Sequence, residues 1–197
     1  MKLIVGLGNP GLNHTKSRHN FGFIVVDRLK DETPGFCDWR TSDEFKSMMV
    51  EGRIGEEKII LVKPQTMMNL SGSAIKALAQ FYKIAPEDIW VIHDDLDLPL
   101  GILRISQGSG SAGHKGVQSI IDNLGSKNFV RLRLGIHPIG QTFFVTFFKK
   151  LTSTNKFVLQ RFSKSEENAI EEVIKKATQA LKTAIQEGLD KAKNQFN

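Results

Sequence analysis

The sequence predicts an α/β fold: a single domain, residues 1–197, in which helices flank a mixed β-sheet and a long helix ends the chain. Short runs of branched apolar residues alternate with segments of helical periodicity, which is typical of an α/β sandwich. Two such runs, residues 45–54 and 57–62, are separated only by a tight turn, which indicates a hairpin and a sheet that is not purely parallel. A chain of 197 residues fits one domain and can bury a core without covalent links.

The predicted strands share short apolar runs bounded by glycine, proline or polar residues. They are residues 2–7, 45–54, 57–62, 88–93, 102–105 and 129–136. The predicted helices share apolar side chains three or four positions apart. They are residues 20–29, residues 71–83 with Ser71 or Ser73 as cap, residues 117–124, and a C-terminal helix that begins at Ser163 or Ser165. Residues 94–97 are predicted to form an acidic turn after the fourth strand.

The composition excludes several classes of protein. With 40% hydrophobic and 24% charged residues, the chain is neither disordered nor fibrous. The single cysteine, Cys37, cannot form an internal disulfide or a cysteine-based zinc site. No apolar run approaches the roughly 20 residues that span a bilayer, and the N-terminal run is too short for a secretory signal. We therefore expect a cytoplasmic protein that does not enter a membrane.

The net charge of +6 is concentrated in one third of the chain. Residues 98–163 carry nine lysines and arginines but a single acid, Asp122, whereas residues 1–97 carry 12 basic and 14 acidic side chains. A one-sided positive field attracts polyanions. A solvated, solubilising surface is the alternative, but the near-absence of acids favours a nucleic-acid partner.

Residues 6–11, G-L-G-N-P-G, match the G-x-G-x-x-G pattern that follows the first strand of dinucleotide-binding domains. In those domains the third glycine opens a helix whose amides face the pyrophosphate. Here residues 12–18 separate Gly11 from the first helical periodicity, and the acid that ends a second strand about 20 residues later is missing. We expect no dinucleotide cofactor.

The candidate catalytic groups are histidines, because no serine lies in a G-x-S-x-G elbow and Cys37 has no evident partner. Histidine titrates near neutrality and can activate water for hydrolysis. His93 with Asp94, Asp95 and Asp97 could ligate a metal, but adjacent acids after a strand are usually a solvated turn. No H-x-x-x-H pair supports zinc. We expect no metal.

Four polar residues stand in loops next to predicted strands or helices, and one of them, Asp94, lies where the active sites of open α/β sheets form. His19 lies where a loop becomes a helix, and Asp94 follows a buried strand. A carboxylate there could hold one imidazole nitrogen and leave the other free as a base. Asn9 and Asn69 occupy similar loops. Each alone is more often structural: an isolated histidine is usually a surface or core residue, and an asparagine a turn residue.

Together with their neighbours, these residues form six ordered motifs at consistent spacing over about residues 1–136. They are V-G-L-G-N-P-G (5–11), S-R-H-N (17–20), K-P-Q-T-M-M-N-L-S-G (63–72), H-D-D-L-D-L-P-L-G (93–101), G-H-K-G-V-Q-S-I (113–120) and R-L-R-L-G-I (131–136). This series closely resembles the bacterial peptidyl-tRNA hydrolase family. The resemblance implies a single α/β domain that hydrolyses, without a metal, the ester between a peptide and the terminal ribose of tRNA, recycling tRNA from aborted translation.

The resemblance also implies roles for individual residues. His19 is expected to take a proton from water, and Asp94 to orient its imidazole and stabilise the imidazolium form. Asn9 is expected to hold His19 or the water. Asn69, with the loop around Met68, is expected to hold the 3′ end of tRNA or the peptide backbone, and Gly113 to let the backbone approach the substrate. The basic third of the chain is expected to contact acceptor-stem phosphates.

This chain departs from the family pattern at four points. Lys115 stands where the family commonly has asparagine; lysine cannot accept a hydrogen bond, so we expect it to contact tRNA instead. His14 stands where tyrosine is frequent and can still stack. Arg133 of the tRNA-binding residues is present, whereas Ser106 replaces a residue that is usually basic; Arg104, two positions away on the same strand face, is expected to substitute. Residues 143–156, rich in phenylalanine, look like a longer insertion than usual, of open function.

A second class of protein fits the same resemblance: a tRNA- or ribosome-binding protein that has kept the fold and lost the chemistry. Lys115 is the feature that raises this alternative. The presence of His19, Asp94, Asn9 and Asn69 argues against it, because a binding protein has no need of a base paired with a carboxylate. We expect a monomeric enzyme.

Overall fold

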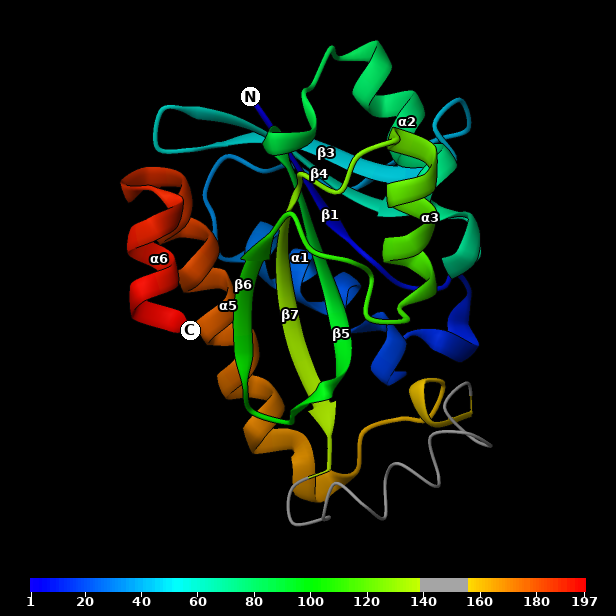
Figure 1. The fold of residues 1–197 in the computed structure, drawn as a ribbon, viewed down its shortest axis with the longest axis vertical. Helices are drawn as coiled ribbons and strands as arrows, with labels where there is room; N and C mark the ends of the chain where they lie inside the picture. The colour runs from blue at the N-terminus through cyan, green and yellow to red at the C-terminus, as the bar shows by residue number, and fades with distance from the viewer. Residues whose placement is uncertain (139–155) are drawn as a thin grey trace.

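The structure is a computed structural model that describes residues 1–138 and 156–197, so the predicted Phe-rich segment, residues 141–155, lies outside the described residues. Within them, seven strands form one sheet in the order β2-β3-β4-β1-β5-β7-β6 (Figure 1). The strands are β1 (Lys2–Gly6), β2 (Arg40–Ser42), β3 (Ser47–Ile54), β4 (Glu57–Pro64), β5 (Ile89–Pro99), β6 (Leu103–Gln107) and β7 (Val130–His137).

The sheet is mixed, as the sequence predicts. β4, β1, β5 and β7 are parallel neighbours, whereas β3 runs antiparallel to β4, β2 to β3, and β6 to β7. The β3–β4 hairpin joins Ile54 to Glu57, close to the predicted turn. The four parallel strands therefore end at one common edge, which is where ligand sites form in such sheets.

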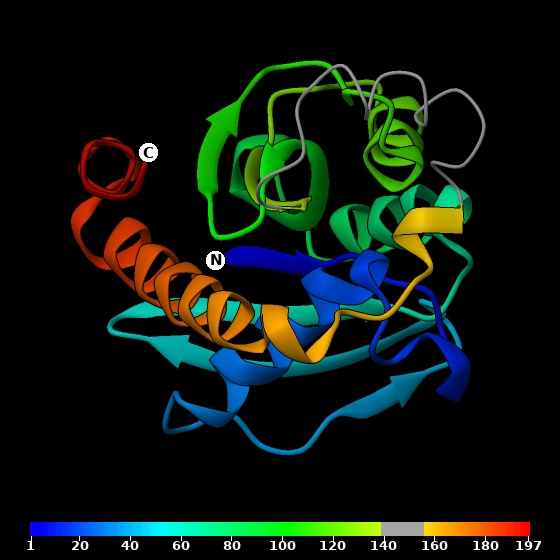
Figure 2. The ribbon, with the colours of Figure 1, turned by 90° about the horizontal axis from the view of Figure 1, so that it is seen from below.

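Helices cover both faces of the sheet (Figures 1 and 2). They are α1 (Phe21–Asp31), α2 (Ser71–Phe81), α3 (Lys115–Leu124), α5 (Glu167–Glu187) and α6 (Leu189–Phe196). One hydrophobic core joins α1, α5 and α6 to one face, and a second joins α2 and α3 to the other. Alternate residues of β1 belong to alternate cores, with Ile4 in the first and Leu3 and Val5 in the second, as the period of a strand buried on both faces requires.

Two glycines allow α1 to lie directly against the sheet. A Cβ on Gly6 would come within 2.4 Å of the carbonyl oxygen of Gly22, and a Cβ on Gly22 within 2.3 Å of the carbonyl oxygen of Ile92. The first glycine of the G-x-G-x-x-G stretch is therefore explained by helix–strand packing. α1 begins only at Phe21, so Gly11 is followed by the short 3₁₀ turn Leu12–His14 and not by the α-helix of a dinucleotide site.

The predicted acidic turn at residues 94–97 is wrong. β5 continues to Pro99, paired with β7 through Asp95 and then through a register shift. Asp94 and Asp95 can lie buried within a strand because each carboxylate has a hydrogen-bonding partner, an imidazole for Asp94 and the guanidinium of Arg133 for Asp95. A sequence pattern shows the acids but not the partners that make their burial tolerable.

Helix ends and one strand also differ from prediction. Neither Ser71 nor Ser73 caps α2; the N-cap position is Leu70, whose carbonyl accepts a hydrogen bond from Ser73. At the C-terminal helix, Ser163 and Glu166 form a capping box, which decides between the two predicted starts. The final helical segment breaks at Gly188, where φ is 102°. β2 was not predicted, because three polar residues at a sheet edge carry no apolar pattern.

Candidate active site

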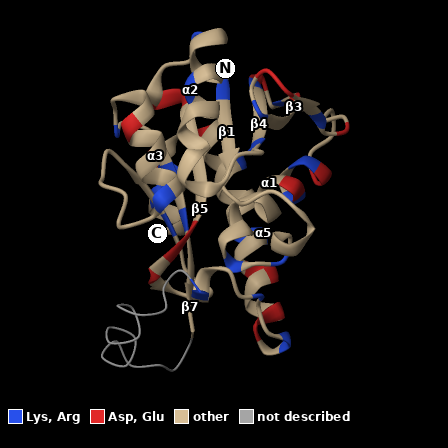
Figure 3. Cartoon of the chain, turned by 90° about the vertical axis from the view of Figure 1, so that its right-hand side faces the viewer, with Lys and Arg blue, Asp and Glu red and all other residues tan. Residues whose placement is uncertain are grey.

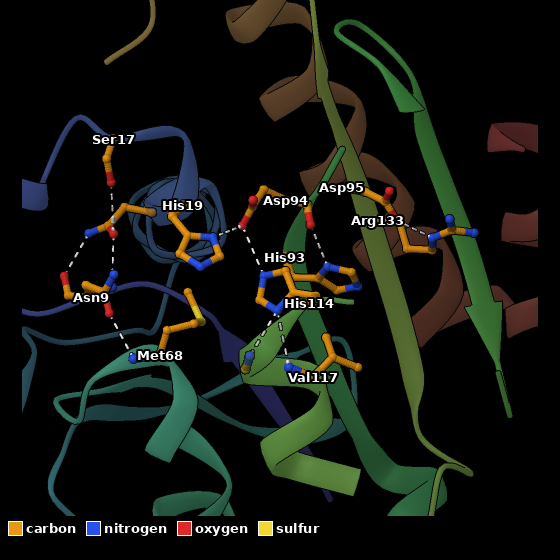
Figure 4. Close-up of polar contacts among 12 residues, drawn as sticks. Asn9, Ser17, His19, Met68, His93, Asp94, Asp95, His114, Val117 and Arg133 are labelled. Carbon is orange, nitrogen blue, oxygen red and sulfur yellow. Dashed lines mark hydrogen bonds and ion pairs between the residues drawn. The ribbon is translucent and has the colours of Figure 1, made fainter. Parts of the chain in front are cut away.

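The predicted site residues His19 and Asp94 meet at the carboxyl edge of the parallel strands (Figure 4). Asp94 lies in β5, and His19 lies in a short 3₁₀ turn, Arg18–Asn20, that leads into α1. The close packing of α1 against β1 and β5 brings this turn against β5, where Asp94 lies. Residues 75 positions apart in the chain are thus brought into hydrogen-bonding contact.

The imidazole of His19 donates to the carboxylate of Asp94. The distance from Nδ1 of His19 to Oδ1 of Asp94 is 2.8 Å, and the Asp94 side chain is 2% exposed. An ionised carboxylate only accepts hydrogen bonds, so the proton of the neutral ring lies on Nδ1 and Nε2 keeps its lone pair. The His19 side chain is 11% exposed, so it is enclosed but in contact with solvent.

A second imidazole, that of His114, donates to the same oxygen of Asp94 at 3.1 Å. Nδ1 of His114 accepts the backbone N–H groups of Gly116 and Val117, both at 3.2 Å, and so caps α3. Because Nδ1 is an acceptor, the proton of His114 lies on Nε2, facing Asp94. This role for His114 was not predicted; the only signal was its place in the G-H-K-G motif, directly before a helix.

Electrostatics keep Asp94 ionised and His93 neutral. Burial acts to raise the pKa of Asp94, but the imidazoles of His19 and His114 outweigh it and hold this pKa well below its usual range. Burial, reinforced by His114, lowers the pKa of His93 well below its ordinary value. His93 donates from Nδ1 to the carbonyl of Asp94 at 2.7 Å, and its ring centroid lies 4.7 Å from that of His114. Asp94 is thus a buried anion supported by imidazoles.

Asn9 is buried and fixed by two neighbouring loops. Its backbone exchanges hydrogen bonds with the side chain of Asn20, both at 2.9 Å, and its side-chain oxygen accepts the N–H of Met68 at 2.8 Å. Of the two roles predicted for Asn9, holding His19 has no hydrogen bond to support it among the described residues. Met68 is 4% exposed, whereas Asn69 beside it is exposed.

A pocket of about 130 Å³ opens beside His19 and Asp94. Two other predicted residues, Gly113 and Lys115, line it, as do His114 and Val158. Gly113 has φ 79° and open space around its Cβ position, so a side chain there would strain the backbone and narrow the approach. Val158 was not predicted; it comes from a segment far along the chain that carries no local signal.

The predicted tRNA-binding arginines lie on the face of the sheet that α3 partly covers. Arg104 of β6 and Arg133 of β7 are directly opposite each other, and Arg104 is exposed. Arg133 donates from Nε to Asp95 at 2.7 Å. Figure 3 shows lysines and arginines gathered under α3, beside the acidic end of β5. His14 lies apart, half-buried in the 3₁₀ turn Leu12–His14, and does not line the pocket.

Among the described residues, the group that could ligate a metal is His19, Asp94 and His114, whose donor atoms lie within 4.8 Å of one another. Their hydrogen bonds do not suit a metal, because Nε2 of His114 carries a proton while Nδ1 accepts from the backbone. His93, the centre of the alternative metal site, belongs to no such group of donor atoms in the part of the chain that the structure describes. His93 is 1% exposed, and the Asp95 carboxylate bonds to Arg133.

Fold and site together define an α/β protein with a histidine–carboxylate centre suited to general base catalysis. The sequence profile of the family described as "Peptidyl-tRNA hydrolase" matches residues 3–197. The peptidyl-tRNA hydrolase of Desulfitobacterium hafniense (strain Y51) is 43% identical over 198 residues, covering 100% of both chains. That of Aquifex aeolicus (strain VF5) is 45% identical over 186 residues, covering 94% of this chain and 91% of the relative.

Solved structures of this family have the same fold. The crystal structure of peptidyl-tRNA hydrolase from Acinetobacter baumannii superposes with a TM-score of 0.86 at 34% identity, covering 100% of this chain and 94% of that one. The chain belongs to the peptidyl-tRNA hydrolase family. Among the described residues, the helices are all too short or too polar to cross a membrane.

Proposed function

We propose that the protein hydrolyses the ester bond between the peptide and the tRNA of peptidyl-tRNA, and so recycles tRNA from aborted translation. Membership of the family supports the substrate. The observation that carries the chemistry is the His19–Asp94 hydrogen bond of 2.8 Å, which leaves Nε2 of His19 as an unprotonated base beside a pocket. An ester is activated enough that a positioned base and groups that polarise its carbonyl suffice without a metal.

The reaction follows from this geometry. Nε2 of His19 takes a proton from water as the water oxygen attacks the ester carbonyl, and the resulting imidazolium is stabilised by the ionised Asp94. When the tetrahedral intermediate collapses, the bond to the ribose oxygen breaks and the imidazolium returns its proton to that oxygen. The products are a free peptide and tRNA. His114 supports this cycle because its Nε2–H holds the Asp94 oxygen in place.

Asn9, Met68 and Asn69 contact the reacting ester in this proposal. The oxygen of Asn9 is occupied by Met68 N–H, so its NH₂ group is the part free to donate, to the attacking water or to the carbonyl oxygen. The exposed amide of Asn69 is able to bind the 3′ end of tRNA or the peptide backbone. Gly113 leaves the backbone open to the substrate on the far side of the pocket.

The tRNA lies on the basic surface. Arg104 and Arg133 contact phosphates of the acceptor stem, Lys115 adds a cation at the pocket rim, and His14 stacks near the 3′ end. Asp95 holds the Arg133 guanidinium by one nitrogen, which leaves the other donors for phosphate. The protein acts in the cytoplasm as a monomer and needs no cofactor.

Release of labelled peptide from purified peptidyl-tRNA tests this function. The purified protein is expected to release peptide well above the buffer rate, and equally in the presence of a chelator. Binding of tRNA without release would make the protein a binding module that has lost the chemistry. Release that the chelator abolishes and added metal restores would show that the histidine–carboxylate centre needs an ion.

A further inference from the structure

Arg18, which directly precedes His19, is almost fully buried and makes its contacts with a distant part of the chain. Its side chain is 7% exposed. Its Nη2 donates to Oε2 of Glu166 at 2.7 Å, so residues 148 positions apart form a shielded ion pair. An arginine buried next to a catalytic base, away from the basic surface, does not serve to attract tRNA.

The guanidinium of Arg18 is also held between two aromatic rings. Its Cζ lies 4.6 Å from the ring centroid of Phe157 and 4.7 Å from that of Phe162. Such cation–π contacts strengthen when they are shielded from water, and a planar guanidinium can in addition stack on a ring, which the ammonium group of lysine cannot. Phe162 in turn packs edge-on against Phe21, the first residue of α1, with centroids 5.2 Å apart.

Backbone contacts join the same two segments. The N–H of Arg18 donates to the carbonyl of Gln160 at 2.9 Å, and Ser17 forms an isolated β-bridge with Arg161. On the far side, Glu166 accepts from the backbone and the hydroxyl of Ser163, each at 2.8 Å, within the capping box of the C-terminal helix. Residues 157–166 are therefore fastened to the turn that carries His19.

This fastened segment also forms part of the pocket. Val158, 8% exposed, lines the same cavity as His19 and Asp94. The position of the base and the position of the apolar pocket wall thus depend on one set of contacts centred on Arg18. Arg18 itself does not line the pocket.

We propose that Arg18 is a positioning residue for the reaction of the proposed function. Its guanidinium, held between Phe157 and Phe162 and paired with Glu166, keeps the His19 turn and the Val158 wall together as one unit. Without it the imidazole of His19 moves relative to Asp94, and the hydrogen bond that fixes its tautomer weakens. A displacement of about 1 Å at a catalytic group can cost about 100-fold in rate.

The test compares Arg18→Met and Glu166→Gln with the control Arg28→Met. Methionine keeps an unbranched apolar stem but no guanidinium. Glutamine removes the charge of Glu166 yet can still serve in a capping box. Arg28 of α1 pairs with Glu171 of α5 at 2.5 and 2.9 Å. The control therefore removes an arginine that joins α1 to α5, the helices that directly follow the His19 turn and the segment 157–166. This arginine lies on the exposed surface and away from His19.

Two readouts separate positioning from general stability. Long-range ¹H–¹⁵N spectra report which nitrogen of His19 carries the proton, and steady-state kinetics separate kcat from KM. For Arg18→Met we expect a mixture of His19 tautomers and a fall in kcat of about ten- to 100-fold with KM within a few-fold. Glu166→Gln is expected to change the His19 tautomer population and kcat in the same direction, but by a smaller amount. Arg28→Met is expected to match the wild type.

The proposal is overturned if folded Arg18→Met keeps the wild-type tautomer and kcat, or if only KM changes. Should Arg18→Met fail to fold, Glu166→Gln decides by the same criteria. The spectra require no substrate. If the wild-type protein released no peptide, the proposed function would fail while the effect of Arg18 on the His19 tautomer could still be measured.

Discussion

Asp94 and Asp95 are adjacent in β5, yet they meet different partners because successive side chains of a strand point to opposite faces. Asp94 accepts hydrogen bonds from two imidazoles, whereas Asp95 pairs with Arg133. In the proposed function the Asp94 carboxylate orients and stabilises His19, so an arginine paired with Asp94 would compete with His19 for that carboxylate. We therefore propose different tasks for two acids that line one pocket: Asp94 supports proton transfer by His19, and Asp95 holds Arg133 for binding of an anion.

The largest effect is expected at His19. Replacement by alanine removes the base, and we expect turnover to fall by about 10³- to 10⁴-fold while tRNA affinity stays within a few-fold. The matched variant His14→Ala is expected to reduce affinity and leave turnover at saturation unchanged. Single-turnover peptide release and tRNA binding are the measurements. A His19→Ala protein with near wild-type turnover would remove His19 from this role.

Replacing Asp94 and Asp95 one at a time tests whether the two acids have different tasks. Asp94→Asn keeps the shape but loses the charge that stabilises the imidazolium, so we expect kcat to fall by about 10²- to 10³-fold. Asp95→Asn loses a partner of Arg133 and is expected to change tRNA affinity instead. Steady-state kinetics of both variants give the result. Equal losses of kcat in the two variants would contradict the different tasks proposed for Asp94 and Asp95.

A smaller effect is expected on the basic face. Arg133→Gln should weaken tRNA binding a few-fold and lower the salt dependence of binding by about one phosphate contact, with kcat at saturation unchanged. Arg53→Gln is the control, because Arg53 lies near the β3–β4 turn, at the opposite edge of the sheet from the site. The measurement is tRNA affinity across a series of salt concentrations. If Arg133→Gln showed the same salt dependence as the wild type and Arg53→Gln, Arg133 would not contact a phosphate.

The smallest effect concerns the pH dependence of stability. The pKa of His93 lies well below its ordinary value in the folded protein because the ring is buried. Below about pH 6.5 the unfolded chain binds a proton at this residue and the folded protein does not. Stability is therefore lost as pH falls from about 6.5 towards the folded pKa, by at most about 1.4 kcal/mol per pH unit.

The variant His93→Gln is expected to show a shallower loss over the same pH range, because glutamine does not titrate. Denaturant unfolding at several pH values measures the free energy of unfolding of both proteins. The difference in slope is the quantity of interest, since glutamine also changes the overall stability. Identical slopes for wild type and variant would show that His93 is not a neutral buried group.

The pairing of His19 with Asp94 could be predicted from the sequence, because the family resemblance implied it and Asp94 directly follows an apolar run that reads as a buried strand. The second imidazole could not. His114 shares the Asp94 oxygen only because its own Nδ1 caps α3, and no spacing reveals a tautomer. The sequence also does not show which groups will pair with Asp94 and Asp95. The two acids were therefore expected in a solvated turn, whereas their hydrogen-bonding partners allow them to lie buried in β5.

Contacts made late in the chain were also beyond prediction. Val158 lines the same pocket as His19, which lies about 140 residues earlier in the chain, and nothing in the local pattern around either residue indicates that they meet. By contrast, the β3–β4 hairpin and the start of the C-terminal helix at Ser163 follow from local signals, a tight turn and a capping box. Local sequence signals were thus sufficient to predict helices and strands, whereas contacts between distant parts of the chain determine which other residues complete the site.

The position of the proton on His19 tests the central claim most directly. Long-range ¹H–¹⁵N spectra of the wild-type protein, recorded where the ring is neutral, distinguish protonation at Nδ1 from protonation at Nε2. Proton transfer from water requires the Nδ1–H form, with Nδ1 donating to Asp94 and Nε2 unprotonated, and this is the expected result. A ring protonated at Nε2 would leave no lone pair facing the water and would contradict the role of His19 as the base.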